Sequence, residues 1–398
     1  MVRSVRSLSR VVTLGDALLL ALAASAAVAT GAGRPPGIAG TAVPALQPVA
    51  VMTIAVGADP TGVAVDPGTH LIYVTNQGDN TVSVIDDSTG RMTATISVGR
   101  NPTAVAVDPK LRRVFVANHG AGSVSVIDAT TNQVTATIAT GVRPSDIVAD
   151  PVTDRLYVAD GDEVRYGNTS GTVRAIDGRS GRVVVAAPVD GLGSVIGGLA
   201  VDPSTNSVYV PYAVRSNPPV ILMLDGTTLR TLAGNGGSTA IYRGTAAGSF
   251  GVAVDPVTHR VFATSPTGFP VAIFDGTSPA AFGRAPVTAD VGASPVGVTV
   301  DPTTGTAYVA QSGRYWGRAA DRDAVSVLDE ATGRVVASVN VGMEPWGIAV
   351  DPGNHLVYVA NHLGHSVTVI AGVNRPAAAA PAPGEHPRSL PMGAARSP

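Results

Sequence analysis

The sequence predicts an all-β fold, a seven-bladed β-propeller built from four-stranded antiparallel blades. The first observation is a repeated unit, since the text of Val56–Ile96 returns almost unchanged at Val98–Ile138. The second is an Asp-Pro pair that closes the first strand of each of seven units, at intervals of 42 to 53 residues. Its aspartates are Asp66, Asp108, Asp150, Asp202, Asp255, Asp301 and Asp351. A repeat of this length that contains four short strands is typical of a β-propeller.

The four strands of each unit are short runs that alternate apolar with small or polar residues. In the first unit they are Thr61–Val65, Leu71–Thr75, Thr81–Ile85 and Met92–Ile96. Each is too short for a helix and is bounded by Gly, Pro, Asn or Asp, as expected of strands joined by tight turns. Larger residues occupy one parity of the first strand. The other parity holds Gly or Ala, which lets neighbouring blades approach near the axis.

The seventh unit lacks a fourth strand at its C-terminal end. Val49–Gly57 resembles the ends of the fourth strands elsewhere, with Ile54–Gly57 set beside Ile96–Gly99. We therefore expect the N-terminal strand to complete the last blade and close the ring. Closure removes a sheet edge that would otherwise invite aggregation.

The second strand of most units ends in a four-letter motif. The forms are YVTN (Tyr73–Asn76), FVAN (Phe115–Asn118), YVAD (Tyr157–Asp160), YVAQ (Tyr308–Gln311) and YVAN (Tyr358–Asn361). These motifs resemble the YVTN family of bacterial β-propellers, which includes the YncE-like proteins. The resemblance covers about Val49–Gly372 and implies the fold, with binding on the rim that carries the loops between blades. It implies little about function, because the family has no shared catalytic motif.

The ends of the chain differ in composition from the repeat. Arg3, Arg6 and Arg10 precede an apolar run, and Ala27–Ala29 supplies the small-x-small pattern of a signal-peptidase site. We therefore expect a signal peptide at 1–29, a flexible leader at 30–48, the propeller at 49–372 and a disordered Pro/Ala-rich tail at 373–398. The alternative is an uncleaved membrane anchor, which Asp16 disfavours. The expected location is secreted or on the cell-envelope exterior, with no membrane span in the mature protein.

Composition excludes several classes of function. The net charge of −2 argues against general nucleic-acid binding, which usually needs a basic excess. The chain has no cysteine, so thiolate metal sites and cysteine nucleophiles are excluded. No hydrolase, phosphate-binding or dinucleotide motif occurs in a suitable setting. We therefore expect no cofactor, and the histidines, including His119 and His362, show no zinc-ligand spacing, so no metal site is predicted.

The turns have a structural interpretation. Asp followed by Pro favours a type I turn, so the seven Asp-Pro carboxylates are expected to hold turns rather than cations. His70, His259 and His355 follow these turns and are interpreted as exposed turn decoration.

A ligand site is expected at the mouth of the central channel, on the face that carries the long loops. One acid, Asp146, stands where the other six blades have Gly or Ala, and Arg143 lies three residues before it. Phe250 and Trp346 occupy the mouth position of their blades, and the longest loop of blade six holds Trp316, which could act as a lid. An alternative is that Trp346 only fills the channel. The complete candidate set is Asp146, Arg143, Phe250, Trp346, Trp316, Tyr315 and Arg314.

These features favour an exported binding or interaction module, monomeric, whose partner is a small molecule or an extracellular or cell-surface molecule. The first alternative is a lactonase-like hydrolase or lyase that uses the central funnel, by analogy of fold alone. The second is single-stranded nucleic-acid binding through loop aromatics and arginines, which the near-neutral charge disfavours. No catalytic residue is assigned.

Overall fold

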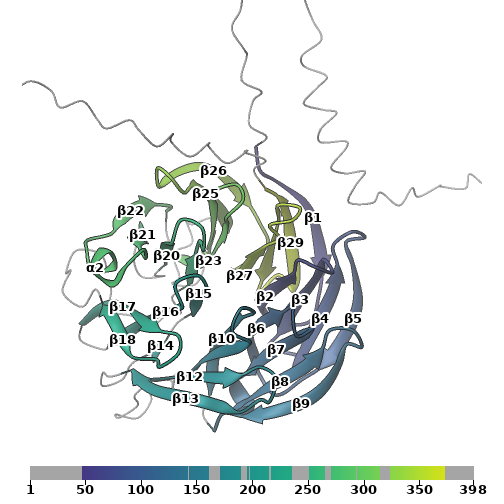
Figure 1. The fold of residues 1–398 in the computed structure, drawn as a ribbon. Coiled ribbons are helices and arrows are strands. Elements are labelled where there is room, and N and C mark those ends of the chain that lie inside the picture. Colours follow the sequence, from purple (N-terminus) through teal and green to yellow (C-terminus); the bar gives the residue numbers. More distant parts are fainter. Residues whose placement is uncertain are drawn as a thin grey trace, which may run out of the picture.

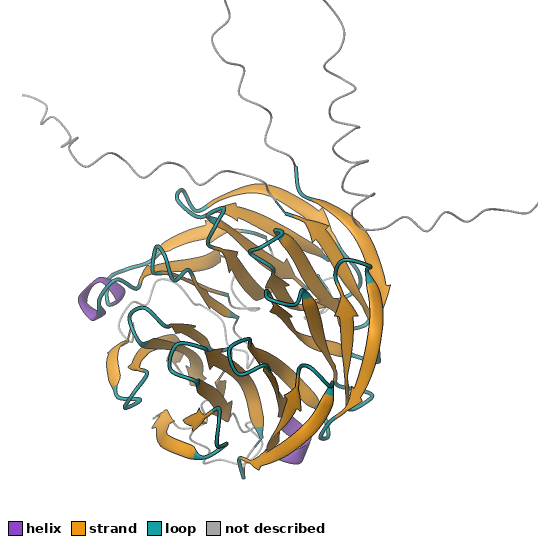
Figure 2. Ribbon diagram, turned by 45° about the vertical axis from the view of Figure 1, so that its right-hand side comes forward, coloured by secondary structure: helices purple, strands orange, loops and turns teal. Residues whose placement is uncertain are grey.

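The alternating runs of the repeat form the strands of seven antiparallel sheets arranged in a ring (Figure 1). The computed structural model describes residues 47–141, 143–160, 171–189, 195–196, 198–214, 217–234, 251–264, 270–292, 294–313 and 323–372. The predicted signal peptide and tail, and the leader up to residue 46, lie outside these described residues. Helix is limited, within them, to the 3-10 turn η1 (His119–Ala121) and the short α2 (Pro279–Phe282) (Figure 2).

The first three blades each contain four consecutive strands, ordered from the axis outward. Blade one holds β2 (Pro60–Asp66), β3 (Leu71–Asn76), β4 (Thr81–Asp86) and β5 (Arg91–Ser97). Blade two holds β6 (Pro102–Asp108), β7 (Arg113–Asn118), β8 (Ser123–Asp128) and β9 (Gln133–Ala139). Blade three holds β10 (Pro144–Asp150), β11 (Arg155–Asp160), β12 (Gly171–Asp177) and β13 (Val183–Val189).

Blade four departs from this plan because its inner strand is in two pieces that both pair with β16. It holds β14 (Val195–Ile196), β15 (Ala200–Asp202), β16 (Ser207–Val214), β17 (Asn217–Asp225) and β18 (Thr231–Gly234). Blade five holds β19 (Val252–Val254), β20 (Arg260–Ala263), β21 (Pro270–Asp275) and β22 (Val287–Asp290). Blade six holds β23 (Pro295–Asp301), β24 (Thr306–Gln311), β25 (Ala324–Asp329) and β26 (Arg334–Asn340).

Blade seven is assembled from both ends of the repeat region, as the sequence predicts. It holds β27 (Pro345–Val350), β28 (Leu356–Asn361), β29 (Ser366–Ala371) and, at its outer edge, β1 (Val49–Ala55). β1 runs antiparallel to β29, with Ile54 opposite Val367 and Thr53 opposite Thr368. In Figure 1 the yellow seventh blade therefore lies beside the purple first blade.

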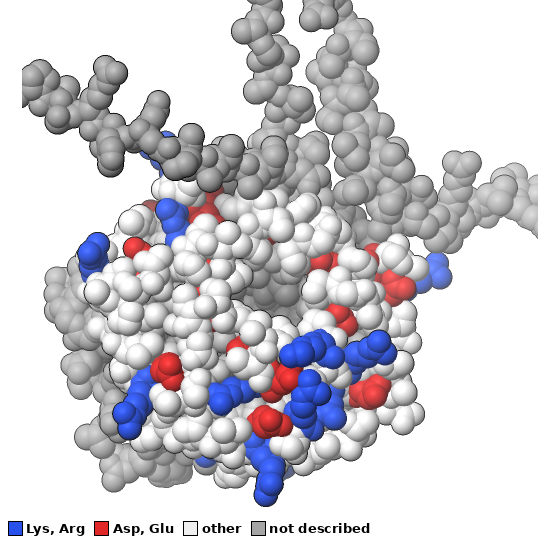
Figure 3. Space-filling model, in the orientation of Figure 1, with Lys and Arg blue, Asp and Glu red and all other residues white. Residues whose placement is uncertain are grey.

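The core is divided among the spaces between blades. Each of the seven pairs of neighbouring blades shares its own cluster of buried apolar side chains. The inner strands close the ring, because β2, β6, β10, β15, β19, β23 and β27 each contact the next, and β27 contacts β2. The ring is hollowed at its centre (Figure 3).

The repeated motif letters have distinct packing roles. The aromatic residue is completely buried in every blade, at Tyr73, Phe115, Tyr157, Tyr209, Phe262, Tyr308 and Tyr358. The hydroxyl of Tyr157 donates to the carbonyl of Gly226 in the next blade at 2.9 Å, which ties two blades together. The terminal Asn stays within its blade. In blade one, Asn76 donates to the hydroxyls of Thr81 and Ser83 on the third strand.

Candidate functional site

The ring has two rims with different chemistry. The turn rim is the edge of the ring that carries the turns between strands one and two and between strands three and four. The loop rim is the opposite edge, which carries the loops between strands two and three and the loops between blades. Most of the long loops of the loop rim lie outside the described residues.

On the turn rim, all seven Asp-Pro aspartates hold their own turns. Each carboxylate accepts a backbone N–H two or three residues further on, as in Asp66 with Gly68 at 2.9 Å and Asp301 with Thr303 at 3.0 Å. The residue four places after the aspartate has a left-handed backbone in every blade, for example His70 with φ 56°. The predicted turn role of these carboxylates is confirmed.

The interpretation of the turn histidines as decoration is wrong, although His70 is exposed as expected. Each one reaches the Asp-Pro aspartate of the preceding blade. The distances from Nδ1 to Oδ2 are 2.7 Å for His259 and Asp202, 2.8 Å for His355 and Asp301, and 2.7 Å for His70 and Asp351. All three aspartate side chains are fully buried, whereas the histidines keep 26 to 46% of their side-chain surface exposed. A ring places the turn of one blade beside the turn of the next, which is what joins these residues.

At one further position on the turn rim, two blades have a different type of residue from the other five. The backbone N–H of the residue after the third strand donates to the carbonyl of the left-handed residue of its own blade, in all seven blades. That residue is small in five blades, at Ala129, Gly178, Gly226, Gly276 and Gly372. It is Asp87 in blade one and Glu330 in blade six, and both side chains are buried.

The Glu330 side chain enters the seam between blades five and six. Its Oε1 accepts a hydrogen bond from the hydroxyl of Thr258, and Arg260 donates to its carbonyl oxygen. Burial, with the neighbouring carboxyl of Asp255, raises the pKa of Glu330 from 4.5 to about 7.

Replacing this acid should remove a pH-dependent destabilisation. In the unfolded chain the carboxyl ionises near its ordinary pKa of 4.5, so between pH 4.5 and about 7 rising pH favours the unfolded state. We expect Glu330→Gln to match the parent near pH 4 and to exceed its unfolding free energy by about 1–3 kcal/mol at pH 8. Urea unfolding at both pH values measures this. Glu344→Gln is the control for losing one negative charge, and an equal effect of Glu330→Gln at pH 4 and pH 8 would contradict the assignment.

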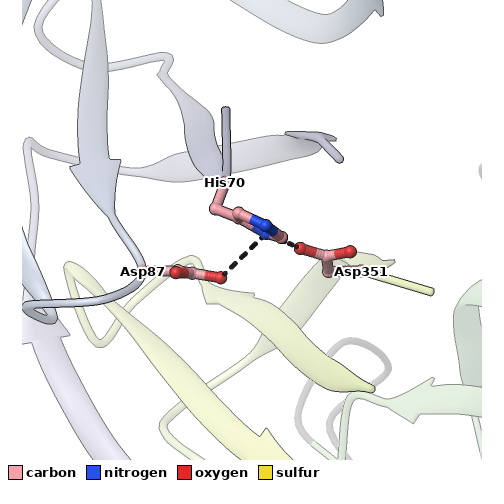
Figure 4. Close-up of side chains that lie close together, drawn as sticks. All are labelled: His70, Asp87 and Asp351. Carbon is pink, nitrogen blue, oxygen red and sulfur yellow. Dashed lines mark hydrogen bonds and ion pairs between the residues drawn. The ribbon is translucent and has the colours of Figure 1, made fainter. Parts of the chain in front are cut away.

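The seam between blades seven and one combines both features, a turn histidine and a buried acid. His70 lies between Asp351 of blade seven and Asp87 of its own blade (Figure 4). Its Nδ1 is 2.7 Å from Oδ2 of Asp351 and 3.7 Å from Oδ2 of Asp87. The hydrogen bond to Asp351 raises the pKa of His70, and burial raises the pKa of Asp87. Among the described residues, this is the one group of three possible metal ligands that converges so closely.

On the loop rim, the same seam carries an aromatic pair. The Trp346 indole at the start of β27 stacks on the His362 imidazole, with ring centroids 4.7 Å apart and planes inclined by 19°. Nδ1 of His362 lies 3.4 Å from the carbonyl oxygen of Pro60 in blade one. Trp346 keeps part of its surface accessible. The sequence predicts Trp346 at the mouth, but no sequence signal pairs it with His362.

Apart from the aspartates of the Asp-Pro turns, Asp146 is the one acid in the described inner strands, and it links two blades. Its Oδ2 accepts the backbone N–H of Leu199 in blade four at 2.5 Å. Burial raises the pKa of Asp146 to about 7, although the backbone N–H groups of Leu199 and Ile147 act in the opposite direction. Arg143, at the approach to β10, is exposed.

The other candidates are placed differently or lie outside the described part of the chain. Phe250, Arg314, Tyr315 and Trp316 are not among the described residues. Hydroxyls near the starts of two inner strands take part in bonds between blades. Thr61 donates to the carbonyl of Pro102 at 3.3 Å, and Thr103 donates to that of Ser145 at 3.1 Å. Trp346 and Asp146 themselves lie on blades seven and three, with blades one and two between them.

Charged side chains are unevenly distributed over the ring. In the view of Figure 3, Lys and Arg gather over blades two to four. Within blades two and three, Lys110 and Arg179 both pair with Asp154, at 2.8 and 2.7 Å. The two cations therefore share one carboxylate. No helix within the described residues is both long and apolar enough to cross a membrane.

Comparisons with known proteins agree with the fold. A family model described as lactonase, 7-bladed β-propeller, matches residues 44–139, which include β1 and blades one and two. A search of curated proteins finds no match. Among solved structures, hydrazine synthase of Kuenenia stuttgartiensis is similar, with a TM-score of 0.65 and 18% identity. The likeness covers 78% of this chain and 95% of that one, and at this identity it shows the fold alone. The topology and these comparisons agree on a seven-bladed β-propeller fold.

Proposed function

We propose that the protein is a binding module whose ligand occupies the loop-rim mouth of the central channel. The observation that carries this proposal is the stacked pair of Trp346 and His362. An aromatic face that stays partly accessible at the end of an inner strand is suited to the flat, apolar side of a small molecule. The rigid ring of inner strands holds it in place without a ligand.

Asp146 supplies a polar group on the far side of the mouth. Its carboxyl is held by Leu199, and its pKa near 7 means that it can offer either a donor or an acceptor close to neutral pH. The exposed Arg143 adds a cation nearby in the chain. A ligand that reaches from blade seven to blade three would combine a ring-like apolar face with a hydrogen-bonding group. Apolar walls with a few placed polar groups are the usual composition of a small-molecule site.

Lactone hydrolysis is the second candidate, and the partial match of the lactonase family model favours it. The match covers about a quarter of the chain, and the described residues of the loop rim offer Asp146, His119 and His362 among their titratable groups. A lactone has both a flat ring and carbonyl acceptors, so the same mouth would serve either function.

One experiment separates the two functions. We would titrate five- and six-membered-ring lactones and neutral monosaccharides into Trp316→Phe protein, in which Trp346 is the remaining tryptophan. We expect a probe to change the indole emission of the Trp316→Phe protein. We expect Trp346→Ala or His362→Ala to weaken its binding, measured by calorimetry, at least about tenfold, as loss of an aromatic contact predicts. Asp146→Asn, which can still accept from Leu199, tests the charge separately.

The outcomes are distinct. Binding without turnover, lost in the aromatic variants, supports the binding module. Lactone opening followed by pH-stat, and lost in Asp146→Asn, supports the enzyme instead. If a probe binds with unchanged emission and with unchanged affinity in all three variants, the site is not at this mouth.

A further inference from the structure

We call the seam between blades seven and one the closure seam. The polar cluster at its turn-rim end has the composition of a metal site. Its members come from three different turns. His70 ends the turn after β2, Asp87 follows β4, and Asp351 follows β27 (Figure 4). Their donor atoms all lie within 4.8 Å of one another. One imidazole and two carboxylates are ligands that zinc and related divalent ions accept.

The distances fit an ion that would sit between the three groups. In a tetrahedral zinc site, bonds of about 2.0–2.1 Å place neighbouring donor atoms about 3.3 Å apart. The two distances from Nδ1 of His70, 2.7 Å and 3.7 Å, lie on either side of this value. Small side-chain rotations therefore suffice to admit the ion. It would replace the proton that Nδ1 of His70 and Asp351 share.

The charge of the cluster also favours a cation. The side chains of Asp87 and Asp351 are 7% and 0% exposed, and a single imidazole faces both of them. Two buried carboxylates beside one histidine leave an excess of negative charge even when the histidine is protonated. A divalent ion would neutralise both acids, which lowers the cost of burying them.

Surrounding groups already orient the two carboxylates. Oδ2 of Asp87 accepts from the amide of Asn354 and, at 3.3 Å, from the hydroxyl of Tyr358. Oδ1 of Asp351 accepts the backbone N–H of Gly353 at 2.8 Å. Such outer hydrogen bonds are what fix metal-ligating carboxylates. His70 is 46% exposed, so the cluster is open to solvent on one side, where water can complete the coordination.

Two other seams of the ring can be compared with the closure seam. Asp301 with His355 and Asp202 with His259 reproduce the histidine–aspartate pair at almost the same distance. In those seams the position of Asp87 is Gly372 or Gly276, so the third ligand is absent. The closure seam is thus the place, among the described turns, where the pair gains a second acid. We propose that His70, Asp87 and Asp351 bind one divalent transition-metal ion of the zinc type, which joins blade seven to blade one. This site departs from the sequence-based expectation of no metal.

The test uses zinc chloride as the probe and the full chain, purified without a histidine tag and treated with EDTA. We expect calorimetry and metal analysis after dialysis at pH 7.5 to find about one zinc ion per chain, with a rise in thermal midpoint. His70→Asn and Asp87→Asn should each weaken zinc binding at least about tenfold. Asn suits the left-handed backbone of position 70, and at position 87 it keeps the side-chain shape.

His355→Asn is the matched control, because it changes the same turn position in a seam that lacks the third ligand. It should leave zinc affinity unchanged. The proposal is overturned if calorimetry and metal analysis find no zinc bound to the parent. It is equally overturned if His70→Asn and Asp87→Asn both bind like the parent, or if His355→Asn loses as much affinity as they do. Circular dichroism of each variant establishes that it is folded before the titration.

Discussion

Removing β1 is expected to leave the seventh blade without its outer strand and to cause a large loss of stability. A variant that begins after residue 56 exposes the whole edge of β29, whose backbone groups now pair with Val49–Ala55. It also removes Ile54 from the cluster shared by blades seven and one. We expect a fall of more than about 10 °C in the thermal midpoint, together with aggregation through the open edge.

The control for this deletion is a variant that lacks residues 1–46 but keeps β1. It should unfold at the same temperature as the full chain. Ile54→Ala tests the packing alone and should cost about 2–4 kcal/mol, whereas the exposed Thr53→Ala should cost less than about 0.5 kcal/mol. Light scattering and differential scanning calorimetry measure both effects. A deletion variant as soluble and as heat-stable as its control would show that β1 does not close the ring.

The fold could be predicted from the sequence because every level of the repeat points to the same blade. The Asp-Pro turn, the buried aromatic residue and the terminal Asn recur in register, and each has the same packing role wherever it occurs. The closing strand was also predictable, since Val49–Gly57 has the text of a missing fourth strand. Because the same residue pattern recurs in seven units, it is distinguished from patterns that occur once by chance.

The chemistry of the seams could not be predicted in the same way. Within one turn, His70, His259 and His355 have no partner, because each partner belongs to the preceding blade. Asp351 is 281 residues from His70 along the chain. Asp87 directly follows Asp86 in a turn, and nothing in the repeat distinguishes it as an acid that is buried in the seam. A comparison of each turn with the next blade, position by position, would have revealed these pairs.

The candidate ligand site shows a related limit. Asp146 was conspicuous as an acid among small residues, but its contact with Leu199 depends on how blades three and four approach. The Trp346–His362 stack joins an inner strand to a loop residue sixteen positions later, and no periodic signal marks it. The loops vary in length from blade to blade, so the repeat does not constrain their side chains.

The second large effect is expected at Gly347, where the inner strands of blades seven and one approach most closely. A Cβ atom at this position would lie 2.1 Å from the carbonyl oxygen of Thr61 and 3.2 Å from the Cα of Gly62. Both atoms belong to the backbone of β2, so no side-chain rotation can relieve the contact. Gly297 and Gly251 show the same approach, at 2.2 Å from the carbonyl of Trp346 and 2.3 Å from that of Val296.

Gly347→Ala should therefore separate β27 from β2 and cost about 3 kcal/mol in unfolding free energy. The sequence alone suggests a mild effect, because Ala104 and Asp146 occupy the same place in blades two and three. Gly283→Ala is the control, since an added Cβ there would meet nothing closer than 3.5 Å and should change stability by less than about 0.5 kcal/mol. Urea unfolding of the two variants distinguishes the large destabilisation expected from the backbone contact from the mild effect that the sequence suggests. Equal midpoints would mean that the closure seam can yield by the width of a methyl group, and the ring would then be less rigid than the contact of β27 with β2 implies.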